Sequence, residues 1–318
     1  MLRKSFVPML LSLLFVFSFG FTVQANGESE IKNDLNELIN EQLNIVSDFN
    51  ESLSIRRGVF NSINLIAPID AEGVLFVSLD DNSDETLKEE ILSLPGIDSE
   101  LIRFVNFEIA WHGPRESRSM EEESDLEIIN LLDPRTIGRE IRMGSVVTIW
   151  GHDWTVGPPL ADNRTSYTAN HGALLNNDAV IRPGTRETMG IVDRWVIGSF
   201  GDASRVNMIP WGHWVSHTLT SISGNMPAPG SWVTSRTGFS GNISGTIFAN
   251  GARVPGFDDP FGRPVTLNDM TIVWMQSQKG DSGAALIAGN TAVGVMSFGG
   301  YIDGRPVVFF TPIRNIPF

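Results

Sequence analysis

The chain has 318 residues, of which 42% are hydrophobic, a formal net charge of −14 and no cysteine. This length corresponds to about two domains, and without cysteine the chain can form neither disulfide bonds nor a cysteine-based lipid anchor. The sequence also argues against a nucleic-acid partner, because no stretch forms the basic surface that phosphates require.

Residues 1–25 predict a secretory signal peptide. Met1-Leu2-Arg3-Lys4 gives a basic start, an apolar run extends from Phe6 to Phe21, and Val23-Gln24-Ala25 forms a cleavage site. An uncleaved anchor is the alternative, but the apolar run is shorter than the ~20 residues that span a bilayer. We therefore expect a secreted protein with no membrane attachment once the signal is removed.

The next segment is acidic and the remainder of the chain is not. Residues 26–135 carry 25 Asp and Glu against 8 Lys and Arg, whereas residues 136–318 carry 12 against 13. Such asymmetry indicates separate modules. Apolar residues at helical spacing predict an amphipathic helix at the start of the acidic segment: Ile31, Leu35, Leu38, Ile39, Leu43, Val46 and Phe49.

The rest of the acidic segment predicts a small α/β module. Val74–Leu79 is typical of a strand, Asp84 is placed to cap a helix that ends at Pro95-Gly96, and Leu101–Phe107 is typical of another strand. From Trp111 to Asp133 the periodicity is lost and the composition is that of a linker.

From Ser145 onward, short apolar runs alternate with turns rich in Gly, Pro, Asn and Asp, and helical periodicity is absent. Val146–Trp150, Trp195–Ile197 and Val307–Phe310 are examples. Many short strands separated by turns predict an all-β sandwich or barrel.

A turn of small residues, Gly280-Asp281-Ser282-Gly283-Ala284, follows the apolar run Met270–Met275. Glycine at 280 lets the N–H groups of residues 280 and 282 converge, which is the geometry of an oxyanion hole. Ser282 needs a base, and every histidine precedes it: His112, His152, His171, His213 and His217. This order disfavours an α/β-hydrolase, in which the histidine follows the serine, and matches the order His, Asp, Ser of double-β-barrel serine proteases.

Thr168-Ala169-Asn170-His171 and Gly280–Leu286 resemble the histidine and serine motifs of the chymotrypsin superfamily. The bacterial streptogrisin-like and α-lytic-like branch is the closer match, because Val233–Thr246 and Ala292–Gly300 are also similar to it. The resemblance covers roughly residues 138–318. The chain departs from streptogrisin-type enzymes in having no cysteine for their disulfides.

The resemblance implies two antiparallel six-stranded β-barrels with the active site between them, preceded by a small α/β pro-region. The division would be a signal peptide at 1–25, an acidic pro-region and linker at 26–135, and a trypsin-like domain at 136–318. Processing would fall between Arg115 and Gly138. A permanent accessory domain is the alternative for the acidic module.

By this resemblance Ser282 is the nucleophile, His171 the base, and an acid between them holds the imidazole in its productive tautomer. The candidates for the acid are Asp178, Asp193, Asp202, Asp258, Asp259 and Asp269. The surroundings of Asp202, Phe200–Val206, resemble those of the family's acid. Asp193 is the second candidate, and is otherwise a charge at a strand edge paired with solvent or arginine.

The resemblance also implies a substrate pocket. Gln276 stands where a trypsin-like enzyme carries aspartate, and Met296 stands where glutamate-specific relatives place histidine. A neutral pocket lined by these two residues with Ser277 and Gly299 would favour an uncharged, apolar side chain. Ser297 to Gly299 would supply the edge strand to which an extended substrate adds.

No cofactor and no metal are expected. His213 and His217 are four residues apart, but the sequence around them alternates like a strand, which would hold their side chains about 13 Å apart, too far for one ion. Asp258 and Asp259 could bind calcium, although an exposed turn is the favoured interpretation.

The sequence therefore predicts a secreted, monomeric bacterial serine endopeptidase, made as a zymogen and acting on proteins or peptides. Its own pro-region would serve as intramolecular chaperone and inhibitor. Two alternatives use the same residues: a catalytically silent homologue with a binding or regulatory role, and an esterase.

Overall fold

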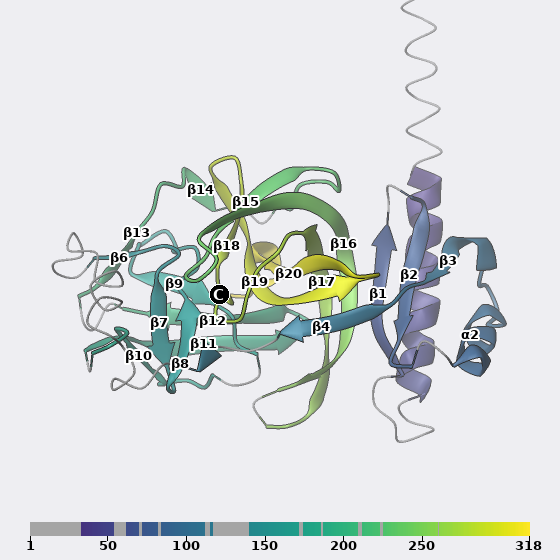
Figure 1. Ribbon diagram of the computed structural model, residues 1–318, viewed down its shortest axis with the longest axis horizontal. Coiled ribbons are helices and arrows are strands. Elements are labelled where there is room, and N and C mark those ends of the chain that lie inside the picture. Colours follow the sequence, from purple (N-terminus) through teal and green to yellow (C-terminus); the bar gives the residue numbers. More distant parts are fainter. Residues whose placement is uncertain are drawn as a thin grey trace, which may run out of the picture.

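The computed structural model describes residues 33–53, 62–69, 72–81, 84–111, 115–116, 140–171, 174–185, 187–208, 212–222, 225–259 and 261–318. The predicted signal peptide and nearly all of the predicted linker lie outside these ranges. Strands dominate, and Figure 1 shows a helix-bearing module at one end of a larger β region. None of the helices in the described ranges combines the length and apolar character needed to cross a bilayer.

The N-terminal module packs a helix over residues 33–53 and α2 (Glu85–Leu92) against β1 (Ile63–Ile69) and β2 (Val74–Leu79). The first helix turns a buried stripe toward these strands, formed by Ile39, Leu43, Val46, Phe49 and Leu53. Asp84 caps α2 by accepting the N–H of Leu87 at 2.9 Å. The predicted helices and the first predicted strand are thus confirmed, although Leu38, expected on the apolar face, is 37% exposed.

Two features of this module differ from the prediction. β1 was not predicted, and the strand expected over 101–107 is divided into η1 (Ser99–Leu101), β3 (Ile102–Phe104) and β4 (Phe107–Trp111). The division falls at Asn106, whose N–H donates to the carboxylate of Asp303 at 2.9 Å and whose carbonyl accepts the N–H of Asp303 at 2.8 Å. These bonds carry the chain from the module onto the C-terminal region.

Six C-terminal strands close into a ring. They are β15 (Trp232–Arg236), β16 (Asn242–Asp258), β17 (Pro264–Trp274), β18 (Ala285–Ala288), β19 (Thr291–Ile302) and β20 (Arg305–Pro312). They pair in the order β15-β18-β19-β20-β17-β16, and a further pairing of β15 with β16 closes the ring. Its interior is apolar, with Val233, Ile247 and Phe310 among the buried side chains.

A second sheet of seven strands lies beside the ring. Its strands are β5 (Arg115–Glu116), β7 (Val146–Ile149), β8 (His152–Thr155), β9 (Thr165–Thr168), β10 (Ala179–Ile181), β11 (Thr188–Gly198) and β12 (Gly201–Asn207). They pair antiparallel in the order β5-β8-β7-β10-β11-β12-β9. The N–H of Gly157, just after β8, donates to the carbonyl of Tyr167 in β9 at 2.8 Å, so the sheet curls until its ends meet. The predicted all-β class with two barrels is confirmed.

Short strands complete the fold. β6 (Glu140–Arg142) pairs parallel with β13 (Trp214–Ser216), β14 (Ser221–Ile222) adds to β19, and η3 is a turn over Ile313–Asn315.

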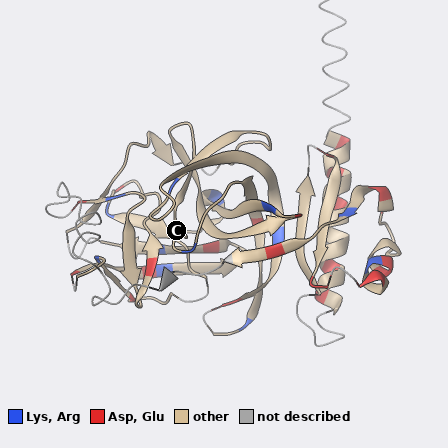
Figure 2. Cartoon of the chain, viewed as in Figure 1, with Lys and Arg blue, Asp and Glu red and all other residues tan. Residues whose placement is uncertain are grey.

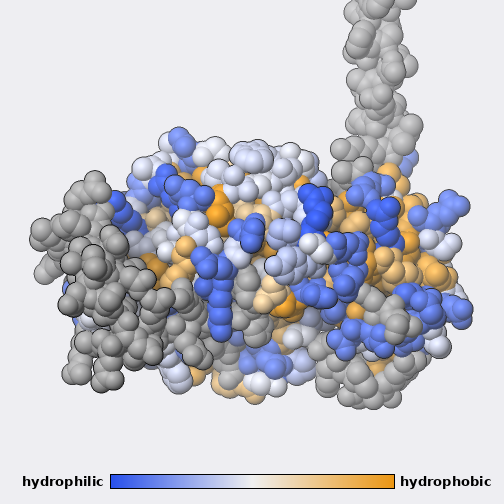
Figure 3. All heavy atoms as spheres, in the orientation of Figure 1, coloured by the Kyte–Doolittle hydropathy of each residue, from blue (hydrophilic) through white to orange (hydrophobic). Residues whose placement is uncertain are grey.

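The N-terminal module is continuous with the ring rather than separate from it. β1 pairs with β16 at Ile66 and Arg253, and β4 pairs with β19, so all these strands belong to one eleven-stranded sheet. A cavity of about 390 Å³ lies at the β1–β16 seam, with Asp48 and Arg253 among its lining residues. Acidic residues gather on the module's helices (Figure 2), and both hydrophilic and apolar residues lie on the face of the module seen in Figure 3.

Candidate active site

Ser282 lies on a tight turn between β17 and β18, and glycine is needed on both sides of it. Gly280 has a φ of 98° and Gly283 a φ of 96°, which L side chains rarely adopt. A Cβ on Gly283 would also lie 2.3 Å from the carbonyl oxygen of Thr155. The turn therefore packs directly against β8, and the N–H of Thr155 donates to the carbonyl of Ser282 at 2.9 Å.

The backbone of this turn leaves two N–H groups for a ligand. The N–H groups of Asp281 and Gly283 donate to the carbonyls of Gln278 and Met296 at 3.1 and 2.8 Å. Within the described part of the chain, no hydrogen bond uses the N–H of Gly280 or of Ser282. These are the two groups predicted to form an oxyanion hole.

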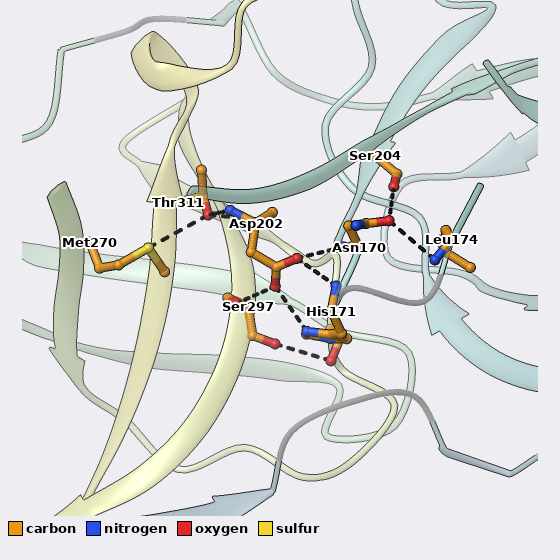
Figure 4. A network of polar contacts seen from close by, with 9 residues as sticks. Asn170, His171, Leu174, Asp202, Ser204, Met270, Ser297 and Thr311 are labelled. Atoms are coloured by element: carbon orange, nitrogen blue, oxygen red, sulfur yellow. Dashed lines mark hydrogen bonds and ion pairs between the residues drawn. The ribbon is translucent and has the colours of Figure 1, made fainter. Parts of the chain in front are cut away.

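His171 and Asp202 are brought together where β9 and β12 pair. Oδ1 of Asp202 accepts the N–H of Asn170 at 2.8 Å and the N–H of His171 at 2.6 Å. Oδ2 lies 2.9 Å from Nδ1 of His171. The carboxylate therefore binds the backbone and the ring of the same histidine, which fixes the orientation of the imidazole (Figure 4).

Two residues of the six-stranded C-terminal ring, in β19 and β20, hold Asp202 from the side opposite His171. The hydroxyl of Ser297 in β19 donates to Oδ2, and the carbonyl of Ser297 accepts the hydroxyl of Ser282 at 3.2 Å. The hydroxyl oxygen of Thr311 in β20 accepts the N–H of Asp202 at 2.8 Å. Ser297 thus contacts both the candidate nucleophile and the candidate acid, and Figure 4 shows its hydroxyl at the carboxylate of Asp202.

Asp202 is wholly buried and still ionises readily. Burial by itself would raise its pKa, but the charge of His171 and the hydrogen bonds from His171 and Ser297 outweigh burial and lower the pKa to about 2. At neutral pH this carboxylate is charged and able to stabilise an imidazolium beside it.

The ring of His171 is enclosed. It stacks on Trp154 with 5.3 Å between ring centroids and 19° between planes, and its side chain is only 2% exposed. The backbone of His171 is left-handed, with a φ of 51°. Ser282 is also fully buried, so substrate cannot reach either residue in this state of the chain.

Asp281, next to the serine, is a second buried aspartate. Its Oδ1 accepts the N–H groups of Phe239 and Ser240 at 3.0 and 3.1 Å, and its Oδ2 accepts the hydroxyl of Ser240 and the N–H of Gln278. These bonds tie the serine turn to the loop after β15.

The other candidate acids have structural partners. Asp193 forms a two-point ion pair with Arg205, both distances being 2.8 Å, as expected for the alternative in which it pairs with arginine. Asp259 accepts the N–H groups of Phe261 and Arg263 and pairs with the Arg263 guanidinium. Both carboxylates are engaged away from His171.

The remaining predicted acids are also elsewhere. Asp178 accepts the N–H of Leu175 at 2.6 Å, Asp269 pairs with Arg314 at 2.7 Å, and Asp258 ends β16.

His213 and His217 do not share a ligand. Nε2 of His213 lies 3.4 Å from Glu187, and Nε2 of His217 lies 3.0 Å from the amide oxygen of Asn163. Across the described ranges, no three His, Asp or Glu side chains gather as a metal site.

The predicted substrate residues lie in different environments. Gln276 is exposed, whereas Met296 is fully buried among the apolar side chains inside the ring. The hydroxyl of Ser277 is buried, and no described group accepts or donates a hydrogen bond to it. Gly299 is paired with Trp111 of β4, so the last residue of the predicted substrate-binding edge, Ser297 to Gly299, already has a partner strand in the chain itself.

Comparisons with known proteins find similar chains among solved structures. No family model matches, and no curated protein matches. Among solved structures, the chain is similar to the chymotrypsin of Cellulomonas bogoriensis, with 24% identity, a TM-score of 0.44, and coverage of 56% of this chain and 93% of that one. It is also similar to a Nocardiopsis protease, with 24% identity, a TM-score of 0.44, and coverage of 55% and 93%.

A third similar structure is Thermobifida fusca protease A, with 23% identity, a TM-score of 0.43, and coverage of 55% and 92%. These structures are bacterial serine proteases of the chymotrypsin type.

Proposed function

We propose that the chain is a serine endopeptidase that cleaves peptide bonds through an acyl-enzyme on Ser282. The observation that carries this proposal is the group of contacts around Ser297, which bonds Ser282 through its carbonyl and Asp202 through its hydroxyl while Asp202 holds the ring of His171. A nucleophile, an imidazole and an oriented acid are the three parts that acyl transfer requires.

Each residue then has a defined task. Ser282 Oγ attacks the carbonyl carbon as its proton passes to Nε2 of His171, while Asp202 accepts a hydrogen bond from Nδ1–H and stabilises the imidazolium. The N–H groups of Gly280 and Ser282 stabilise the oxyanion. His171 then protonates the leaving amine, and water releases the acyl group by the same path.

The preferred substrate is an extended peptide with an uncharged, apolar side chain before the cleaved bond. Its backbone adds to the edge of β19 at Ser297 to Gly299. The side chain enters a neutral pocket at Gln276, Ser277 and Met296, none of which carries a charge that would bind a basic or acidic residue.

The N-terminal module is the pro-region of a secreted proenzyme in this proposal. Two observations support this role. β4 pairs with the β19 edge that a substrate would use, and the side chains of Ser282 and His171 are buried in the intact chain. Export through residues 1–25 and cleavage between Arg115 and Gly138 would yield a free, monomeric enzyme.

A fluorophosphonate probe tests this function directly. The secreted wild type should be labelled on a fragment that begins between Arg115 and Gly138, and Ser282→Ala should not be labelled. Ser221→Ala, which removes an exposed serine, is the matched control and should be labelled like the wild type.

Two outcomes would contradict the proposal. A processed chain that the probe does not label would be a silent homologue, and a labelled chain that hydrolyses apolar esters but no peptide would be an esterase.

A further inference from the structure

Thr155, the last residue of β8, binds both residues that supply the predicted oxyanion hole. Its hydroxyl donates to the carbonyl of Gly280 at 2.9 Å, and its N–H donates to the carbonyl of Ser282 at 2.9 Å. Within the described ranges, the N–H groups of these same two residues donate to no other group. One residue thus fixes the carbonyls of the two residues whose N–H groups would meet the substrate.

The direction of the hydroxyl bond follows from a second partner. The N–H of Gly238, in the loop after β15, donates to Oγ1 of Thr155 at 3.1 Å, and a backbone N–H can only donate. Toward Gly238 the hydroxyl oxygen is therefore an acceptor, and its single proton is directed at the carbonyl of Gly280, which can only accept. The hydroxyl joins this loop to the serine turn.

The peptide unit between Gly280 and Asp281 is held at both ends. The hydroxyl of Thr155 binds its carbonyl, and its N–H donates to the carbonyl of Gln278 at 3.1 Å. Gly280 has no Cβ and a φ of 98°, so the residue itself restrains this unit little. Without the hydroxyl we expect the unit to rotate, and the N–H of Gly280 to turn away with it.

The peptide unit between Ser282 and Gly283 is held in the same way. The N–H of Thr155 donates to its carbonyl, and its own N–H donates to the carbonyl of Met296 at 2.8 Å. Because each peptide unit is planar, holding these two units restricts the one between them, which carries the N–H of Ser282. The convergence of the two oxyanion-binding N–H groups thus depends on two bonds from one residue.

Thr155 is itself firmly placed. It is fully buried, it pairs with Val146 of β7, and its carbonyl accepts the hydroxyl of Thr168 in β9 at 3.1 Å. The residue before it, Trp154, stacks on the imidazole of His171. β8 therefore contacts the candidate base with one residue and the serine turn with the next.

We propose that Thr155 is a positioning residue for acyl transfer, which keeps the N–H groups of Gly280 and Ser282 directed at one point. This inference rests on the proposed function. Negative charge develops on the substrate oxygen as the tetrahedral intermediate forms, so the bonds of Thr155 matter in the transition state rather than in ground-state binding. Losing the hydroxyl should therefore lower kcat and leave KM nearly unchanged.

Thr155→Val keeps the shape of the side chain and removes the hydroxyl. On an extended apolar peptide, we expect kcat of the secreted, processed enzyme to fall roughly 10²-fold, with KM changed by less than about threefold. The rates are divided by the amount of serine that the fluorophosphonate labels, so that unfolded chains do not contribute. Thr155→Ser keeps the hydroxyl and should retain kcat within about threefold.

A pair of ligands measures the oxyanion hole directly. With a tetrapeptide ending in leucinal, Ser282 Oγ bonds to the aldehyde carbon, the electron pair of the C=O bond becomes the oxyanion, and the serine proton passes to His171. The same tetrapeptide ending in leucinol binds without this reaction. We expect Thr155→Val to weaken the aldehyde roughly 10²-fold and the alcohol by less than about threefold. An equal loss for both ligands would overturn the inference.

Thr271→Val is the matched control. Thr271 is a fully buried threonine of β17 whose hydroxyl donates to the side chain of Asn250 at 2.8 Å. This variant should keep kcat and the preference for the aldehyde over the alcohol. Should Thr155→Val not be recovered as a folded chain, Thr155→Cys takes its place. Its thiol is a weak donor and acceptor, and we expect it to reduce the preference about 10-fold.

The outcomes separate this inference from the proposed function. If the wild type is labelled and prefers the aldehyde, but Thr155→Val behaves like it, the inference is wrong and the proposed function stands. The inference is also wrong if Thr155→Ser loses as much as Thr155→Val, or if Thr271→Val loses the preference. If the wild type is neither labelled nor prefers the aldehyde, the proposed function itself is wrong.

Discussion

Asp202 and Asp281 are two fully buried aspartates, one on each half of the β region. Their carboxylates accept hydrogen bonds from almost the same set of donor types. Each accepts two neighbouring backbone N–H groups on Oδ1 and a serine hydroxyl on Oδ2, from Ser297 and Ser240 respectively. Their fourth partners differ. Asp202 faces the imidazole of His171, whereas Asp281 accepts the N–H of Gln278.

The comparison shows that a buried carboxylate in this fold needs no cation to be satisfied. Hydrogen bonds to a charged group contribute about 1.5–3 kcal/mol each, and the pocket of Asp281 is built from such bonds alone. The imidazole beside Asp202 is therefore not required for burial, and its presence there points to chemistry. Asp281 has a different effect, because it fixes the shape of the serine turn.

The largest effect should come from Asp202→Asn. The amide oxygen can keep both backbone N–H groups, but the amide nitrogen donates to Nδ1 of His171 and leaves the proton on Nε2, the atom that must accept it from Ser282. We expect kcat of the processed enzyme on an apolar peptide substrate to fall roughly 10⁴-fold. The unfolding free energy at neutral pH should fall by about 2 kcal/mol, because the variant lacks a carboxylate whose pKa is about 2 in the folded chain against 3.8 when unfolded. If Asp202→Asn lowered the unfolding free energy but left kcat unchanged, Asp202 would not differ from Asp281 in having a chemical role.

Asp281→Asn should affect both quantities. The new amide nitrogen faces the N–H of Gln278, so one buried donor loses its acceptor, at a cost of about 1–3 kcal/mol of unfolding free energy. Because a displacement of the serine turn by 1 Å is enough to cost about 10²-fold, we expect kcat to fall by that factor. Denaturant unfolding and kinetics on the same preparation would measure both, and an unchanged kcat would show that the turn keeps its shape without the carboxylate.

Ser297→Ala and Ser240→Ala form a matched pair. Each removes one hydroxyl from one buried carboxylate, so each should lower the unfolding free energy by about 1.5–3 kcal/mol. Only Ser297→Ala should lower kcat, by roughly 10-fold, because its hydroxyl holds the acid that orients His171. Equal kinetic effects of the two variants would contradict this difference.

The smallest effect concerns acid stability. The pKa of Asp202 is about 2 in the folded chain and has its ordinary value of 3.8 when unfolded. Its stabilising contribution is therefore complete above about pH 4 and is lost as the pH falls through 3.8 toward 2. Unfolding free energies measured between pH 5 and pH 2 should fall less steeply for Asp202→Asn than for the wild type, and parallel curves would show that Asp202 is not linked to acid unfolding.

The residues of the candidate site that were found from sequence all lie in short local patterns. His171 follows Thr-Ala-Asn, Ser282 lies in a glycine turn, and Asp202 follows a glycine at a strand start. The supporting residues could not be found in this way, because Ser297 and Thr311 reach Asp202 across 95 and 109 residues of sequence. Nothing near either residue indicates a contact that only the packing of two sheets creates.

The fold was predicted in the same uneven manner. The short apolar runs separated by turn residues were sufficient to predict the all-β class. β1 was missed because Pro68 makes its sequence a poor strand signal. The structure accommodates this proline because β1 pairs with β16 only at Ile66. On the other side of the strand, Pro68 pairs with Leu75 of β2. Likewise, the pairing of β4 with β19 could not be predicted from sequence, since the two strands lie nearly 200 residues apart.

The left-handed backbone of His171 has a consequence for chemical rescue. At a φ of 51° glycine is unstrained, so His171→Gly removes the ring without distorting the chain. The change leaves a flat slot between Trp154 and Asp202, with the dimensions of the lost ring. We expect free imidazole to bind in that slot, because it has the shape of the lost ring and would contact the same carboxylate and the same aromatic face. Of the three residues of the candidate triad, the base is thus the one whose function a small molecule from solution can restore.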